Sequence, residues 1–211
     1  MLNVHLQQAL IFAALQGERE RLAGGIAVSG PWLESAPMSD VNPIPADRPF
    51  VVPYMTIGAR TDGSPGGAAD AIEWYAAAFG AQETNRQMAP GGNKVMHAEL
   101  VLGDGLLFLA DDFPEWGGEA SAPSALNGST VTLHRYVADC DATIEKAVTM
   151  GAEVLMPPED MFWGDRFGSI RDPFGHKWSI ATHMRDVSPE DMEAAAAAMF
   201  AEGPDQEQSG G

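Results

Sequence analysis

The pattern of apolar and polar positions changes period in a fixed order along the middle of the chain. A strand-like run, PFVVPYMTI, precedes AADAIEWYAAAFGA, where apolar residues recur at helical spacing up to a glycine. Three strand-like runs follow, QETNRQMA, NKVMHAELVL and GLLFLAD, with turn residues PGG and GDG between them. The pattern predicts a strand, a helix and three further strands.

The same order of elements occurs a second time. Asp70-Ala71 and Gly80-Ala81 recur as Asp141-Ala142 and Gly151-Ala152, an offset of 71 residues. STVTLHRYV precedes the second helix, and EVLMP, RFGSIRD and HKWSIAT follow it, with turns expected at PPED and DPFG. A period this long indicates a tandem duplication rather than a solenoid. We therefore predict an α+β fold of two paired βαβββ modules.

The flanking segments differ from this repeated region. Residues 1–49 read as an N-terminal extension and linker, and Met38 offers a second start that would make residues 1–37 an appendage. We expect the domain to span 50–185, with modules at 50–112 and 128–185. In the remaining segment, 186–211, Ser188 and Pro189 predict the start of a helix, and the acidic tail after it is expected to be disordered.

Charge and composition exclude several classes of partner. Thirty acidic and 12 basic residues give a net charge of −18, which repels nucleic acid and anionic membrane surfaces. The apolar patch near the N-terminus is too short to span a bilayer and has no preceding Lys or Arg. The single cysteine, Cys140, is expected to be structural and fits a reducing compartment, so a cytoplasmic location is the default. Nucleotide-binding glycine motifs are absent from the sequence.

A resemblance to a known family rests on five stretches in order: AADAIEWYAAAFGA, HAELVLGDGLLFLAD, VADCDATIEKAVTMGAEVLMP, FWGDRFGSIRDPFGHKWSIATH and DVSPEDM. The chain resembles the vicinal oxygen chelate superfamily, which includes glyoxalase I, extradiol dioxygenases and bleomycin resistance proteins, and within it the PhnB-like branch. The resemblance implies that each module curls into half of a barrel-like cup. It also implies a pocket between cups, often with strands from both subunits, so a homodimer is expected.

The resemblance further implies where a metal would be held in metal-using members. Those positions fall near Pro53 or Tyr54, at Phe108, near Thr132 and at Ser179, and none of these residue types is a His or carboxylate ligand. We therefore expect no cofactor, with a divalent metal as the disfavoured alternative. The predicted function is binding of a small molecule, with sequestration of a cationic or planar compound as the specific form.

Two residues on one expected strand offer a second interpretation. His97 and Glu99 are two apart and so share a face, and a two-residue turn at Gly103-Asp104 would place Glu99 opposite Phe108. With His134 they could form an atypical site of a glyoxalase-like lyase or isomerase, or of a dioxygenase. Such residues also commonly bond only to one another or to backbone, so catalysis stays open.

The remaining candidates lie mostly in the second module. We assign catalytic roles, if any, to Glu99 and His97, and ligand-binding roles to His134, Phe108, Thr132, Trp163, Arg166 and Ser179. Phe162 and Trp163 could line a pocket rim or cover the hairpin. Asp165, Arg166, Arg171 and Asp172 are more simply explained by ion pairs and turn hydrogen bonds, with ligand contact by Arg166 or Asp165 as the alternative.

Overall fold

The computed structural model describes residues 45, 48–49, 51–117 and 119–201. The first module comprises β1 (Tyr54–Ile57), α2 (Ala68–Phe79), β2 (Gln82–Met88), β3 (Val95–Leu102) and β4 (Gly105–Asp111). A linker with η2 (Pro114–Trp116) and α3 (Pro123–Leu126) leads to the second module. That module comprises β5 (Thr132–Tyr136), α4 (Cys140–Thr149), β6 (Glu153–Asp160), β7 (Asp165–Arg171) and β8 (Lys177–His183), and α5 (Pro189–Ala201) follows it.

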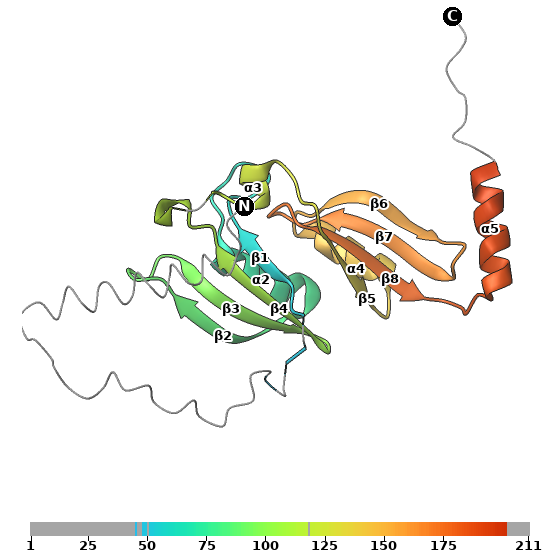
Figure 1. Cartoon of the computed structure of the whole chain (residues 1–211), viewed down its shortest axis with the longest axis horizontal. Helices are drawn as coiled ribbons and strands as arrows, with labels where there is room; N and C mark the ends of the chain where they lie inside the picture. Colours follow the sequence, from blue (N-terminus) through green and yellow to red (C-terminus); the bar gives the residue numbers. More distant parts are fainter. Residues whose placement is uncertain (1–44, 46–47, 50, 118, 202–211) are drawn as a thin grey trace, which may run out of the picture.

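Each module forms a four-stranded mixed sheet with one helix packed on it, and the two sheets lie side by side (Figure 1). The strand orders are β1-β4-β3-β2 and β5-β8-β7-β6. In both sheets the first strand pairs in parallel with the last, and the other pairs are antiparallel. The predicted α+β fold of two βαβββ modules is confirmed.

Local signals in the sequence account for the ends of the helices. Helix α2 ends at Gly80, whose φ of 71° is the left-handed conformation that glycine adopts without a steric penalty. Helix α4 begins after Asp139, whose side chain accepts a hydrogen bond from the amide of Ala142. Strands β3 and β4 join through Gly103 and Asp104, with Gly103 at a φ of 65°. The expected two-residue turn is therefore present.

The prediction of a turn at PPED, residues 157–160, is wrong. Strand β6 continues through these residues to Asp160, and the chain reverses instead at Met161–Gly164, where Met161 and Gly164 close the turn by hydrogen bonds. Two prolines are tolerated because β6 is the edge strand and pairs only with β7, so a missing N–H need not break the sheet. The register shifts on either side of Met156 absorb the irregularity.

The two modules differ in the loop that follows their first strand. The offset of 71 residues relates Gly80 to Gly151 and Phe108 to Ser179. Strand β1 instead corresponds to β5 at a larger offset, because Tyr54 pairs with Phe108 as His134 pairs with Ser179. The loop between β1 and α2 in the first module is correspondingly longer than the loop between β5 and α4. This insertion changes which residue of β5 occupies the equivalent site position.

A single apolar core runs through both modules. Helix α2 contacts α4, and the rings of Tyr75 and Phe79 on α2 lie 5.6 Å and 4.9 Å from Trp178 of the second module. The carboxylate of Asp172, only 1% exposed, accepts hydrogen bonds from the Tyr75 hydroxyl and the Trp178 indole N–H. Burial and the neighbouring Asp172 raise the pKa of Tyr75 well above its usual value. A buried polar network therefore fixes the two modules together.

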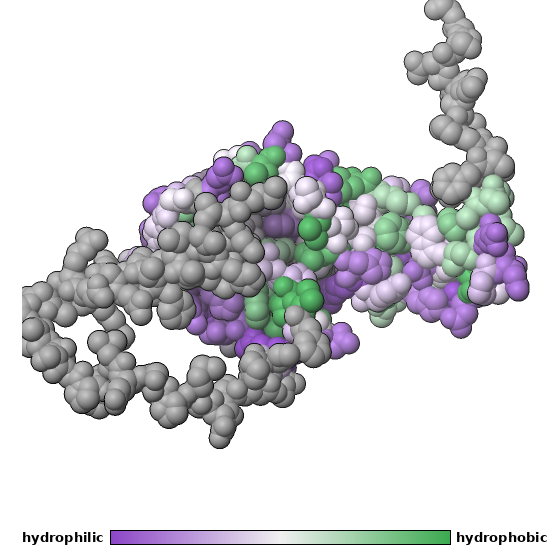
Figure 2. Space-filling model, in the orientation of Figure 1, coloured by the Kyte–Doolittle hydropathy of each residue, from purple (hydrophilic) through white to green (hydrophobic). Residues whose placement is uncertain are grey.

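Helix α5 stands apart from both sheets, and much of its visible side is mildly hydrophobic (Figures 1 and 2). Ser188 and Asp191 exchange hydrogen bonds at its start, as an N-cap serine does. Among the described residues, no helix is long and apolar enough to cross a membrane. The predicted N-terminal extension and linker lie largely outside the described residues, and the predicted disordered tail lies outside them entirely.

Candidate functional site

The face of the first sheet opposite α2 carries a connected group of polar and aromatic side chains, which we call the first open face. Its members are Tyr54, His97, Glu99 and Phe108. The Tyr54 hydroxyl lies 3.0 Å from His97 Nδ1, and His97 Nε2 lies 3.3 Å from Glu99 Oε1. The rings of Tyr54 and His97 lie 5.9 Å and 4.9 Å from the Phe108 ring. Glu99 pairs across the sheet with Phe108, as predicted.

Glu99 is the buried centre of the first open face, with only 8% of its surface exposed. Its carboxylate accepts hydrogen bonds from Asn85 Nδ2 at 3.3 Å and from Arg48 Nη1 at 2.7 Å. Burial opposes ionisation of Glu99, but the hydrogen bonds from Arg48, Asn85 and His97 outweigh it, so its pKa lies below the usual value. The site therefore holds a fixed, ionised carboxylate beside aromatic rings.

The second open face, on the side of the other sheet opposite α4, carries a separate group: His134, Tyr136, Phe167 and Ser179, with Trp163 beside them. His134 Nδ1 lies 2.7 Å from Ser179 Oγ, and its ring lies 4.8 Å from Tyr136 and 6.2 Å from Phe167. Trp163 packs edge-on against Phe167 at 5.8 Å and against Phe162 at 5.0 Å. The structure thus groups His134, Ser179 and Trp163, three of the predicted ligand-binding residues.

A buried carboxylate, Asp165, lies at the edge of the second open face, and the sequence offered it as an alternative ligand contact beside Arg166. Asp165, 6% exposed, accepts a hydrogen bond from the Tyr136 hydroxyl at 3.2 Å and lies 2.8 Å from His183 Nδ1. The other nitrogen of His183, Nε2, lies 3.1 Å from Asp186. His183 was not among the predicted site residues. Its position could have been inferred from the sequence, because it follows Ser179 by four residues on one strand and so shares its face.

The pKa of His183 should lie above its usual value of 6.5, because its hydrogen bonds to Asp165 and then Asp186 favour the protonated ring. The ion pairs therefore stabilise the fold fully below pH 6.5 and lose this contribution as pH rises through the raised pKa. We expect an NMR titration of the His183 ring protons to show a midpoint above 6.5. The Asp186→Asn variant should lower that midpoint, and a wild-type midpoint at or below 6.5 would contradict the pairing.

Comparison with known proteins gives the family. The model of the Glyoxalase/Bleomycin resistance protein/Dioxygenase superfamily matches residues 65–180, more than half of the chain. The chain belongs to this superfamily.

Two relatives resemble this superfamily member in sequence. It is 42% identical over 129 residues to the uncharacterized protein Rv0887c of Mycobacterium tuberculosis, covering 61% of this chain and 75% of the relative. It is 31% identical over 131 residues to the uncharacterized protein At5g48480 of Arabidopsis thaliana, covering 59% and 76%.

Two solved structures align with this superfamily member over 64% of its length. The Arabidopsis thaliana At5g48480 gene product aligns with a TM-score of 0.49 and 26% identity, over 64% of this chain and 98% of that one. A protein from Bacillus cereus described as a putative 3-demethylubiquinone-9 3-methyltransferase, PhnB protein, aligns with a TM-score of 0.48 and 15% identity, over 64% and 99%.

The positions at which metal-using relatives were expected to hold a metal can now be assigned by register. The β5 position equivalent to Tyr54 is His134, not Thr132, because His134 pairs with Ser179 while Thr132 pairs with Lys177. The four positions in this superfamily member are Tyr54, Phe108, His134 and Ser179. Only His134 has the imidazole or carboxylate chemistry that a divalent ion of this kind uses, so the residues present do not fit that metal.

His97, Glu99 and His134, the residues of the alternative catalytic site, do not form one group among the described residues. His97 contacts Glu99 on the first open face, whereas the contacts of His134 are to Ser179, Tyr136 and Phe167 of its own sheet. Across residues 51–117 and 119–201, together with residues 45 and 48–49, no three His, Cys, Asp or Glu side chains are grouped to hold a metal ion.

Arg166 faces a different environment from the other predicted ligand-binding residues. Its guanidinium binds both carboxylate oxygens of Asp141 at 2.8 and 2.7 Å and reaches Asp160 at 3.2 Å. These bonds, to Asp141 first, raise its pKa further above the usual value. Contact between Arg166 and a ligand stays a prediction, and this geometry gives it no support.

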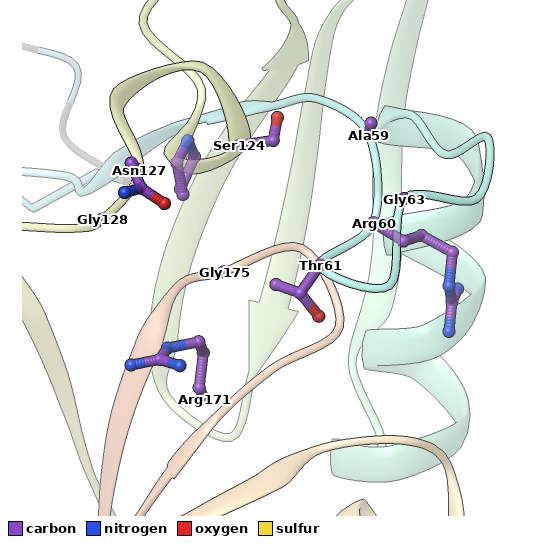
Figure 3. Close-up of a pocket in the computed structure, with 10 residues that line it drawn as sticks. Ala59, Arg60, Thr61, Gly63, Ser124, Asn127, Gly128, Arg171 and Gly175 are labelled. Atoms are coloured by element: carbon purple, nitrogen blue, oxygen red, sulfur yellow. The ribbon is translucent and has the colours of Figure 1, made fainter.

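A cavity of about 630 Å³ lies at the junction of the modules, between the β1–α2 loop, α3 and the turn at Gly175 (Figure 3). Arg60 and Arg171 line it, but their guanidinium groups point away from one another (Figure 3). Arg171 also binds Glu153 at 2.6 Å. None of the predicted site residues lines this cavity.

Proposed function

We propose that this protein binds a small organic molecule against its first open face, and that it sequesters a cationic or planar compound. The observation that carries the proposal is the buried, ionised Glu99 held beside Tyr54, His97 and Phe108 on the sheet face opposite α2. Flat rings favour stacking with a planar ligand, and a carboxylate that is already ionised favours a positive charge. The net charge of −18 attracts cations at longer range.

We further propose that a homodimer completes the binding site. The first and second open faces each hold a separate polar group, and within one chain His97 and His134 bond to different neighbours. A second copy that set its second open face against the first open face would enclose a ligand between aromatic surfaces. Sedimentation velocity should then give a dimer, and ligand binding should weaken on dilution into the monomer range. A monomer that binds the ligand equally well at every concentration would reject this arrangement.

Replacing His97 with alanine should weaken binding of compounds found in a thermal-shift screen of planar and cationic molecules by about tenfold. The change removes the ring that contacts both Tyr54 and Phe108 and one hydrogen bond to Glu99, together worth roughly 1–2 kcal/mol. Isothermal titration calorimetry measures the difference. Val154→Ala, an exposed truncation on β6, is the matched control and should leave affinity unchanged. Equal loss in both variants, or none in His97→Ala, would place the ligand elsewhere.

A catalytic role is the second candidate, a lyase, isomerase or dioxygenase reaction. The chain of contacts from Tyr54 through His97 to Glu99 favours it, because a carboxylate that orients an imidazole is a common arrangement for proton transfer. Elemental mass spectrometry of the purified protein tests the metal-dependent form. Stoichiometric zinc, nickel, manganese or iron that is lost in both His97→Ala and Glu99→Ala would support it, and metal retained in both variants would contradict it.

A further inference from the structure

Arg48 lies over the first open face, although it belongs to no strand of the sheet. Its Nη1 donates to Glu99 Oε2 at 2.7 Å, and its Cζ lies 5.6 Å from the centroid of the Phe108 ring. The Arg48 side chain is 34% exposed, whereas the Glu99 side chain is 10% exposed. The guanidinium therefore stands between solvent and the buried carboxylate, and it makes a charge-assisted hydrogen bond and a cation–π contact together.

The two partners of this ion pair are held in different ways. Glu99 is fixed in β3, where Asn85 and His97 bond its other oxygen. Arg48 lies 51 residues earlier, on the segment that leads to β1. An ion pair in which one side chain is about one-third exposed contributes only modestly to the free energy of folding. The carboxylate, in contrast, would be costly to leave buried without a cation. The position above Glu99 thus requires a positive group but does not require Arg48.

We propose that Arg48 is an internal occupant of a cation subsite formed by Glu99, Asn85 and Phe108, and that a ligand carrying a planar amidinium or guanidinium group binds there by displacing it. The subsite matches that chemistry, because a flat cation can donate to a carboxylate while its plane contacts an aromatic ring. This inference rests on the proposed function, since it names the ligand group that the first open face selects. Arg48 then acts as a tethered competitor that lowers the apparent affinity for such a ligand.

Benzamidine, a planar aromatic amidinium, is a suitable probe, titrated into the full chain by calorimetry and by NMR. Arg48→Ala should bind benzamidine roughly three- to thirtyfold more tightly than the wild type, because the internal competitor is gone. Arg86→Ala is the control: Arg86 pairs with the exposed Glu83 on β2, so the variant removes the same charge away from the site. It should change affinity less than twofold. Adding Glu99→Gln to Arg48→Ala should abolish the gain.

The outcomes separate this inference from the proposed function. If benzamidine binds the wild type and Arg48→Ala equally and Glu99→Gln weakens both, the site is real and the role of Arg48 is rejected. If Arg86→Ala tightens binding as much as Arg48→Ala, net charge explains the effect and the inference fails. If benzamidine binds no variant while uncharged planar compounds bind in a His97-dependent way, the proposed function stands and the cation subsite is rejected. Thermal unfolding of each variant verifies that the fold is retained.

Discussion

The Asp172→Ala variant should unfold with a free energy lower than that of the wild type by roughly 3–5 kcal/mol. The carboxylate of Asp172 accepts four hydrogen bonds: from the Tyr75 hydroxyl, the Trp178 indole N–H and the backbone amides of Phe174 and His176. Tyr75 and Asp172 are almost fully buried, so water cannot replace the lost acceptor without entering the core. The loss also removes a polar link between α2 and the second sheet.

The Asp172→Asn variant distinguishes the roles of the two carboxylate oxygens of Asp172. Its carbonyl oxygen can still accept from the amides of Phe174 and His176, but its NH₂ group would face the indole N–H of Trp178. Asp172→Asn should therefore cost less than Asp172→Ala, about 1–3 kcal/mol.

Urea denaturation followed by tryptophan fluorescence measures both changes, since Trp178 lies at the site. Asp160→Ala is the matched control, because that side chain is exposed and makes one peripheral contact with Arg166. Its effect should stay within about 0.5 kcal/mol. A loss below about 1 kcal/mol in Asp172→Ala would show that the network does not support the module junction.

Replacing Gly164 with alanine should lower the free energy of unfolding by about 2–4 kcal/mol. Gly164 has a φ of +101°, which side-chain-bearing residues rarely adopt, and a Cβ there would lie 2.2 Å from the carbonyl oxygen of Arg185. The amides of Met184 and Arg185 both donate to the Gly164 carbonyl. The methyl group would therefore push the segment after β8 away from the β6–β7 turn.

The Gly92→Ala variant distinguishes the cost of a positive φ from the cost of a steric clash. Gly92 also has a positive φ, +71°, but a Cβ there meets no atom within 4 Å. It should cost only the backbone penalty, about 1 kcal/mol. Chemical denaturation gives the two free energies, and hydrogen exchange should show faster exchange at Met184 and Arg185 in Gly164→Ala alone. Equal destabilisation by both variants would mean that the close approach of Arg185 contributes nothing.

The fold could be predicted from sequence because local and long-range signals agree. The glycines that end α2 and α4 and the glycine at the β3–β4 turn stand where the backbone requires them. The error at Pro157 and Pro158 came from reading proline as a local turn signal. Only the sheet topology shows that β6 is an edge strand, where a missing N–H is tolerated.

The site was only partly predictable, for a similar reason. His97 and Glu99 follow from a period of two within one strand, and Phe108 follows from the turn length. Arg48 could not be found this way, because it reaches Glu99 from outside every periodic element. The position on β5 equivalent to Tyr54 is His134 rather than Thr132 because the β1–α2 loop is the longer one. A constant offset between the repeats does not reveal this difference in loop length.

Cys140 allows local opening of the second module to be measured by thiol modification. It is the single cysteine of the chain, 1% exposed, and its thiol donates to the carbonyl of Ile180 at 3.2 Å. Burial, and then Asp141, raise its pKa, so the native thiol is a poor nucleophile. An alkylating reagent can attack the sulfur only when α4 separates from β8. The rate of its modification therefore counts openings of one half of the duplicated domain, while the other half has no thiol to react.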